Sequence, residues 1–112
     1  MDIAGTRVLV TGGARRLGRA IALGLGERGA QVAFTYHRSA DGARETAAEL
    51  AAAGAGGHAT HADLADGLAA RRAVEQATSA LGGLDVLVHA ASGGFAPPFG
   101  SVFPVASLGV SA

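Results

Sequence analysis

Short apolar runs along the chain alternate with longer segments whose apolar residues recur at helical spacing. The runs predict strands over residues 7–10, 31–36 and 84–89, and the longer segments predict helices over residues 16–28, 41–53 and 67–81. Residues 58–61 (HATH) give a weaker strand signal between the second and third helices. Strands that are apolar on both faces and alternate with helices are typical of a parallel sheet with right-handed crossovers. The pattern therefore predicts an α/β fold, the first half of a doubly wound parallel sheet.

The first predicted helix carries an apolar stripe that includes a glycine. Its members are Leu17, Ala20, Ile21, Gly24 and Leu25. Glycine weakens the interior of a helix. Gly24 within this stripe therefore predicts a close approach of the helix to the sheet.

Glycines also mark the passage from the first strand into the first helix. Gly12 follows the strand directly, and Gly18 returns where the helix begins. Such a turn gathers unpaired backbone N–H groups and the positive end of a helix dipole, where a phosphate can bind. Within a β-α-β unit this is typical of a Rossmann-type dinucleotide-binding fold. The alternative is a glycine-containing turn with no ligand.

The second predicted strand ends in the polar triplet His37, Arg38 and Ser39. In dinucleotide-binding folds this position meets the adenosine ribose, and an acidic residue there favours NAD. A guanidinium and a hydroxyl favour instead the 2′-phosphate of NADP. A solvated polar turn is the alternative. Asp41, close by, is interpreted as an acid at a helix start.

Two further stretches follow the third and fourth strands, at the sheet edge where ligands of such folds bind. Asp63, followed by Leu64, offers a carboxylate that can accept a hydrogen bond from the adenine amino group, but it is also placed to cap the next helix. Residues 88–94 are mostly small, which lets a cofactor pass close to the backbone. His89 among them is interpreted as structural, because a catalytic base needs a positioned partner.

Composition limits the kinds of partner. The 112 residues carry nine basic and nine acidic side chains, and this balance argues against a nucleic-acid partner. Cysteine is absent, and His58 and His61 would point to opposite faces of a strand, so no metal site is expected. Neither a bilayer-spanning stretch nor a signal-peptide pattern is present, so a cytoplasmic protein without a membrane partner is expected.

The sequence changes in character after Ala91. Residues 92–112 contain no charged side chain, and Gly and Pro recur in them. Gly and Pro interrupt helices and strands, so their density here predicts a loop followed by an irregular or disordered tail. The expected organisation is a dinucleotide-binding half-domain over residues 1–91 and this tail over residues 92–112.

Three segments together resemble the short-chain dehydrogenases/reductases. Residues 11–18 (TGGARRLG) are similar to the family's cofactor loop, Thr-Gly-x-x-x-Gly-x-Gly. Asp63-Leu64 looks like the family's adenine-side acid, and residues 84–92 (LDVLVHAAS) resemble its segment Asp-x-Leu-Val-Asn-Asn-Ala-Gly. The resemblance covers roughly residues 5 to 97.

Within the family, the chain resembles the pteridine reductases, which have an Arg at the middle glycine of the loop and a second strand ending Tyr-His-Arg-Ser. The resemblance implies NADP(H) as cofactor and, in the complete protein, hydride transfer to a carbonyl or pterin-like substrate. It places Arg16 beside the cofactor phosphates and Ser92 near the pyrophosphate. The expected cofactor-binding residues are Gly12, Arg16, Leu17, Gly18, His37, Arg38, Ser39, Asp63, Leu64, Ala91 and Ser92.

The chain departs from the family pattern in two respects. His89-Ala90 stands where the family has two Asn, the first of which normally stabilises the central strand. The family's catalytic Tyr-x-x-x-Lys pair has no counterpart, because the sequence contains no Lys and its only Tyr, Tyr36, lies in the second strand. No catalytic residue is therefore assigned. The chain is expected to be a truncated or frame-shifted reductase fragment that lacks the family's oligomerisation helices; a non-catalytic NADP-binding module and an unstable product are alternatives.

Overall fold

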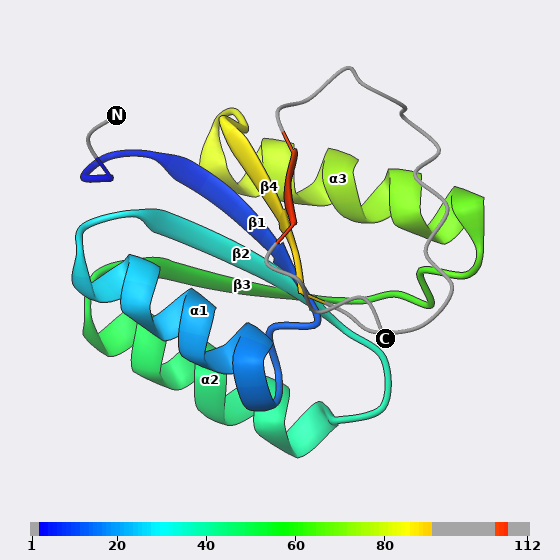
Figure 1. Cartoon of the computed structure of the whole chain (residues 1–112), viewed down its shortest axis with the longest axis horizontal. Coiled ribbons are helices and arrows are strands. Elements are labelled where there is room, and N and C mark those ends of the chain that lie inside the picture. Colours follow the sequence, from blue (N-terminus) through cyan, green and yellow to red (C-terminus); the bar gives the residue numbers. More distant parts are fainter. Residues whose placement is uncertain (1–2, 91–104, 108–112) are drawn as a thin grey trace.

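Five parallel strands form a single sheet in the computed structural model, which describes residues 3–90 and 105–107 (Figure 1). Their order across the sheet is β3-β2-β1-β4-β5. The strands are β1 (Arg7–Thr11), β2 (Gln31–Tyr36), β3 (Gly56–His61), β4 (Val86–His89) and β5 (Val105–Ser107), and the helices are α1 (Arg16–Glu27), α2 (Ala40–Ala52) and α3 (Gly67–Leu81). Every neighbouring pair of strands is parallel, so the predicted α/β sheet with its β-α crossovers is confirmed.

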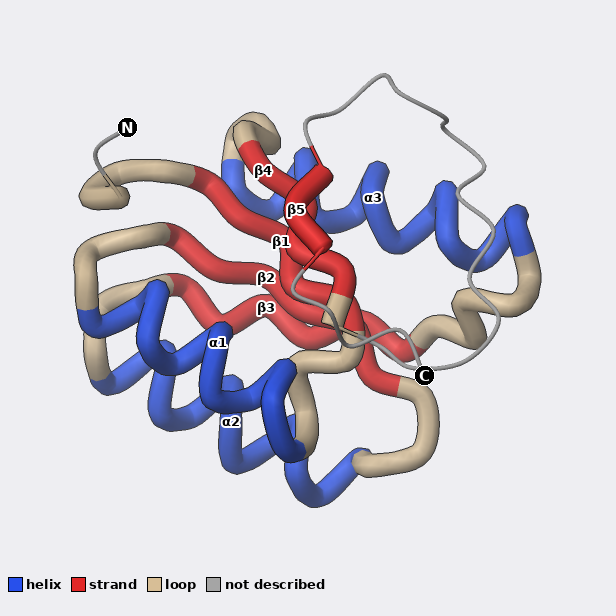
Figure 2. Tube along the Cα trace, viewed as in Figure 1, coloured by secondary structure: helices blue, strands red, loops and turns tan. Residues whose placement is uncertain are grey.

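Helices cover both faces of the sheet. Figure 2 shows α1 and α2 together on one face and α3 on the other. Strand residues alternate between the two layers, because successive side chains of a strand point to opposite faces. The α1–α2 side buries, among others, Val8, Val10, Val32, Phe34, Leu50 and Val88, and the α3 side buries Leu9, Ala33, Val74, Ala77 and Leu87. No helix in the described part of the chain is long and apolar enough to cross a membrane.

Strand β5 lies within the segment that the sequence predicts to be irregular. It pairs with β4 in parallel, with Leu87 opposite Val105 and His89 opposite Ser107. The prediction of an irregular segment is therefore wrong for these three residues. A strand this short carries too few positions for a periodic pattern, and the surrounding Gly and Pro hide it.

Helix α1 packs only in part through the residues predicted. Its buried positions are Gly18, Ala22 and Gly26, spaced four residues apart, whereas Leu17 is exposed. A Cβ on Gly24 would meet nothing within 4 Å, so the predicted close approach at Gly24 is wrong. Ile21 and Leu25 of the predicted stripe are partly buried and pack against the core, as expected. The fully buried positions are small, which allows the helix axis to lie close to the sheet.

An ion pair joins the amino-terminal end of β1 to the turn before β4. The Arg7 guanidinium donates through Nε to Asp85 Oδ2 and through Nη2 to Asp85 Oδ1, both at 3.1 Å. The backbone N–H of Arg7 also donates to Oδ2 at 2.9 Å. These hydrogen bonds from Arg7 hold the pKa of Asp85 below its usual value. The pair fixes the relative position of two strands whose sequences lie far apart.

Candidate cofactor site at the carboxyl edge of the sheet

The glycine loop after β1 is anchored to the end of β2. Gly12 has a φ of +73°, and its N–H donates to Thr35 Oγ1 at 3.1 Å. The N–H of Gly13 donates to the Thr35 carbonyl oxygen at 3.0 Å. Thr35 is buried, so it is a structural support of the loop that the sequence reading missed. The sequence signal for this role was a hydroxyl residue, Thr35, directly after the apolar centre of the strand.

Three glycines allow close approaches around this loop. A Cβ on Gly18 would lie 1.9 Å from the carbonyl oxygen of Gly12, which leaves no room for any side chain there. A Cβ on Gly13 would lie 2.5 Å from Phe34 Cβ, and one on Gly42 of α2 would lie 2.5 Å from the Ala14 carbonyl oxygen. The loop is therefore held by β2, by its own helix and by the first turn of α2.

The amino-terminal turn of α1 presents uncompensated positive potential. The first N–H with a helical acceptor is that of Arg19, which donates to the Arg15 carbonyl oxygen at 3.2 Å. The N–H groups before it have no acceptor within the helix. Arg15, at the N-cap, makes no side-chain capping bond, and no acidic residue lies in the first turn. The turn can accept an anion without displacing a side chain.

Arg16 has a left-handed backbone. Its φ is +52°, and no other non-glycine residue in the described ranges has a positive φ. For a residue with a Cβ this conformation costs about 1–2 kcal/mol. Arg16 stands where the short-chain dehydrogenase pattern has its middle glycine, so the chain keeps the glycine backbone while it adds a guanidinium. Strain of this kind tends to persist at functional positions.

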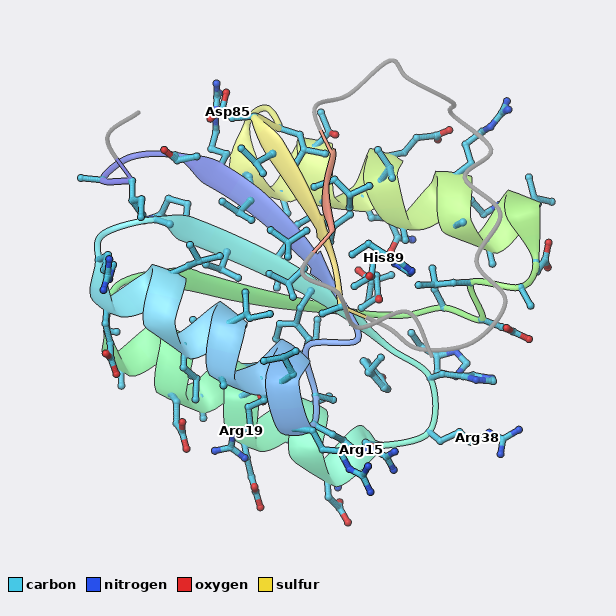
Figure 3. The ribbon with its side chains drawn as sticks, in the orientation of Figure 1. Arg15, Arg19, Arg38, Asp85 and His89 are labelled. Carbon is cyan, nitrogen blue, oxygen red and sulfur yellow. The ribbon has the colours of Figure 1, made fainter. Side chains whose placement is uncertain are left out.

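The turn after β2 leaves its polar side chains available. His37 and Arg38 are exposed, and Figure 3 shows Arg38 extending away from the ribbon at the same end of the sheet as Arg15. Ser39 is the N-cap residue of α2, but its side chain makes no capping bond. Asp41 lies in the first turn of α2, as predicted, and its carboxylate pairs with Arg44. None of the ion pairs formed within residues 3–90 involves Arg38.

Asp63 lies beyond the end of β3 but does not cap α3. Its Oδ1 accepts a hydrogen bond from the N–H of Ala65 at 3.0 Å, which closes a local turn. The N-cap of α3 is Asp66, whose Oδ1 accepts from the N–H of Leu68 at 3.0 Å. The alternative of Asp63 as a helix cap is therefore wrong, because a second Asp three residues later takes that position. Leu64 lines a small apolar pocket between the sheet and α3.

His89 takes part in a hydrogen-bond network at the carboxyl end of β1. Its Nδ1 lies 2.9 Å from Thr11 Oγ1, and that oxygen accepts from the N–H of Ala90 at 3.1 Å. The imidazole thus stands at the sequence position of the family's first Asn and keeps a polar contact to Thr11 of the central strand. Burial lowers the pKa of His89, which favours the neutral ring.

The lowered pKa of His89 predicts that acid weakens the fold. Below the ordinary imidazole pKa of 6.5 the unfolded chain binds a proton more readily than the folded chain, so the free energy of unfolding falls as the pH falls through that value. We expect His89→Asn to reduce this loss between pH 7.5 and 5.5, measured by urea unfolding. His58→Asn, at an exposed position of β3, is the matched control. An unchanged pH dependence in His89→Asn would contradict the assignment.

The predicted site residues converge only in part within the described structure. The glycine loop, the turn at residues 37–39 and Asp63 follow the carboxyl ends of the adjacent strands β1, β2 and β3. Ala91 and Ser92 lie outside the described residues. Within those residues, no group of three or more His, Cys, Asp or Glu side chains could hold a metal ion.

Comparison with known proteins decides the family. A family model described as short chain dehydrogenase matches residues 6–104. The chain belongs to the short-chain dehydrogenase family. Among curated members, the 3-oxoacyl-[acyl-carrier-protein] reductase FabG of Staphylococcus epidermidis is 40% identical over 81 residues, which are 72% of this chain and 33% of FabG. The L-rhamnose 1-dehydrogenase (NAD(P)(+)) of a Sphingomonas species is 39% identical over 84 residues, 75% of this chain and 33% of that protein.

Solved structures of the family agree with the fold. A short chain dehydrogenase from Burkholderia cenocepacia in complex with NADP is 44% identical with a TM-score of 0.77, and the match covers 85% of this chain and 38% of that one. A blue fluorescent protein from a metagenomic library in complex with NADPH is 42% identical with a TM-score of 0.79, covering 91% and 42%. The chain spans about one third of the length of the curated relatives described above.

Proposed function

We propose that the chain is the NADP(H)-binding portion of a short-chain dehydrogenase/reductase. The observation that carries the proposal is the turn at the end of β2, which presents Arg38 and Ser39 without an acidic residue at the ribose position. The NADP and NADPH complexes of two similar structures support it. A guanidinium with no carboxylate partner in the described structure suits a dianionic 2′-phosphate.

Different site residues would bind different parts of the cofactor. Gly12 turns the loop with a φ of +73°, and Gly18 leaves room for the Gly12 carbonyl. The loop they shape would present the pyrophosphate to the first turn of α1, where Arg16 and the N–H of Leu17 lie. His37, Arg38 and Ser39 hold the 2′-phosphate. Asp63 and Leu64 would border the adenine. By the resemblance to the family, Ser92 would lie near the pyrophosphate and the pterin-like ring, with Ala91 beside it in the sequence. When bound, the nicotinamide ring supplies or accepts a hydride; these residues bind and orient it.

The proposed substrate in the complete protein is a carbonyl compound or a pterin-like ring. It rests on Arg16 at the middle loop position and on the Tyr-His-Arg-Ser end of β2, as in pteridine reductases. We assign no catalytic residue, because the sequence contains no Lys and its only Tyr, Tyr36, lies in β2. NADPH binding without turnover of carbonyl or pterin substrates would make this chain a cofactor-binding module.

Cofactor-dependent melting tests the proposal. Because a ligand that binds only the folded state stabilises it, NADPH at about 100 times its Kd should add about 2.7 kcal/mol to the free energy of unfolding. NADH at the same concentration should add less. The measurement is the melting temperature of the purified chain with each cofactor. No shift with either cofactor would overturn the proposal.

Replacement of Arg16 by Gly should separate stability from binding. Glycine adopts a φ of +52° without strain, so we expect Arg16→Gly to raise the free energy of unfolding by up to about 1 kcal/mol. The same change removes a cation beside the phosphates and should weaken NADPH binding about tenfold. Urea unfolding and calorimetric titration measure the two effects. Arg15→Gly, at the neighbouring position with a φ of −144°, should give no gain in stability.

A further inference from the structure

Three aromatic rings gather where β2 and β3 end. The rings of Tyr36 and His61 have centroids 5.4 Å apart at an interplanar angle of 66°, an edge-to-face contact. The rings of His37 and His61 have centroids 5.7 Å apart at 48°. His61 therefore contacts both other rings. Neither the glycine loop nor the family resemblance gives His61 a role.

The pairing of β2 with β3 explains why His61 contacts Tyr36. Tyr36 and His61 are register partners in the parallel pair of β2 and β3, so their side chains leave the same face of the sheet side by side. Tyr36 is half-buried and packs against the core on the α1–α2 side, whereas His61 and His37 are exposed. His61 thus connects a ring held by the core to a ring on the turn.

The ring of His61 is the described aromatic neighbour that contacts His37. His37 lies in the turn after β2, outside any regular element, and no side-chain hydrogen bond to another described residue holds it. An exposed side chain with several open rotamers loses conformational entropy when it binds a ligand. A ring contact that selects one rotamer beforehand reduces that loss.

We propose that His61 is a positioning residue for cofactor choice: it holds the His37 ring ready for the 2′-phosphate through the ring contacts of His61 with Tyr36 and His37. The proposal rests on the proposed NADP(H) site. Along the chain, Arg38 directly follows His37, and Asp63 comes two residues after His61. His61 acts through His37 and does not itself touch the phosphate.

Cofactor preference is the quantity that His61 should change. We expect His61→Ala to lower the ratio of the NADH Kd to the NADPH Kd about two- to tenfold, measured by calorimetry on the full chain. His61→Phe keeps a ring at this position and should restore most of the ratio. His58→Ala, an exposed histidine on the same strand, is the matched control and should leave the ratio unchanged.

A measurement without cofactor keeps the inference testable if a variant does not fold. In the NMR spectrum of the wild-type chain, ring protons of His37 and His61 should show a nuclear Overhauser effect, with His37→Gln used for assignment. Absence of that effect overturns the inference. Equal weakening of NADPH and NADH by His61→Ala, or no restoration by His61→Phe, also overturns it. If wild-type chain shows the ring contact but binds no NADPH, the proposed function fails separately.

Discussion

Gly18→Ala is expected to destabilise the fold by about 3 kcal/mol and to abolish the response to NADPH. The added Cβ would lie 1.9 Å from the carbonyl oxygen of Gly12 and 2.7 Å from its carbonyl carbon. Both atoms belong to the backbone of the loop, so no side-chain rotation can relieve the clash. The loop must move away from α1, and the proposed phosphate position moves with it.

Gly24→Ala is the matched control for this prediction. Gly24 lies in the same helix, and a Cβ there would meet nothing within 4 Å. Alanine should therefore stabilise α1 by up to about 1 kcal/mol through its better helix propensity. Urea unfolding gives both free energies. A loss of less than about 1 kcal/mol in Gly18→Ala would show that the loop accommodates the methyl group.

Arg38→Asp should weaken NADPH binding about 10- to 100-fold while NADH binding stays the same or improves. The change removes a charge-assisted hydrogen bond to the 2′-phosphate and puts a negative charge beside it. A carboxylate at this position can also accept hydrogen bonds from the ribose hydroxyls of NADH. Arg38 is exposed and forms no ion pair within residues 3–90, so the fold should tolerate the change.

Arg72→Asp makes the same charge change at an exposed position of α3, on the opposite face of the sheet from α1 and α2. It should leave the preference between the two cofactors unchanged. Calorimetric titration of both variants with NADPH and NADH measures the effect. Equal losses for both cofactors in Arg38→Asp would refute the 2′-phosphate assignment.

The sequence was sufficient to predict the order of the elements up to β4, because short apolar runs mark β1, β2 and β4 and helical spacing persists over many residues of each helix. It placed the buried face of α1 only in part: Ile21 and Leu25 pack against the core as predicted, but Leu17 is exposed. The pattern gives most weight to large apolar residues, whereas Gly18 and Gly26 are fully buried. Small residues become buried where the backbone of α1 comes close to the sheet. A periodic pattern of apolar residues does not predict how close that approach is.

Within the candidate site, the sequence indicated which residues to examine but not what holds them. The glycine loop and the turn at residues 37–39 follow from motif spacing. The support given by Thr35, the left-handed backbone of Arg16 and the choice of Asp66 over Asp63 as helix cap depend on contacts and dihedral angles. Each depends on which of several neighbouring groups makes a given contact, and motif spacing alone does not predict that.

The ion pair between Arg7 and Asp85 has a consequence for synthesis on the ribosome. β1 is the central strand, yet its partner β4 and the anchoring Asp85 come 78 residues later in the chain. One side of β1 can pair with β2 early, but the other side stays open until almost all of the described domain has been translated. Contacts between distant segments form slowly, because a long loop must close first. During translation, the open side of β1 is therefore the edge at which a nascent chain most readily pairs with another chain. A chaperone that covers this edge would prevent such pairing.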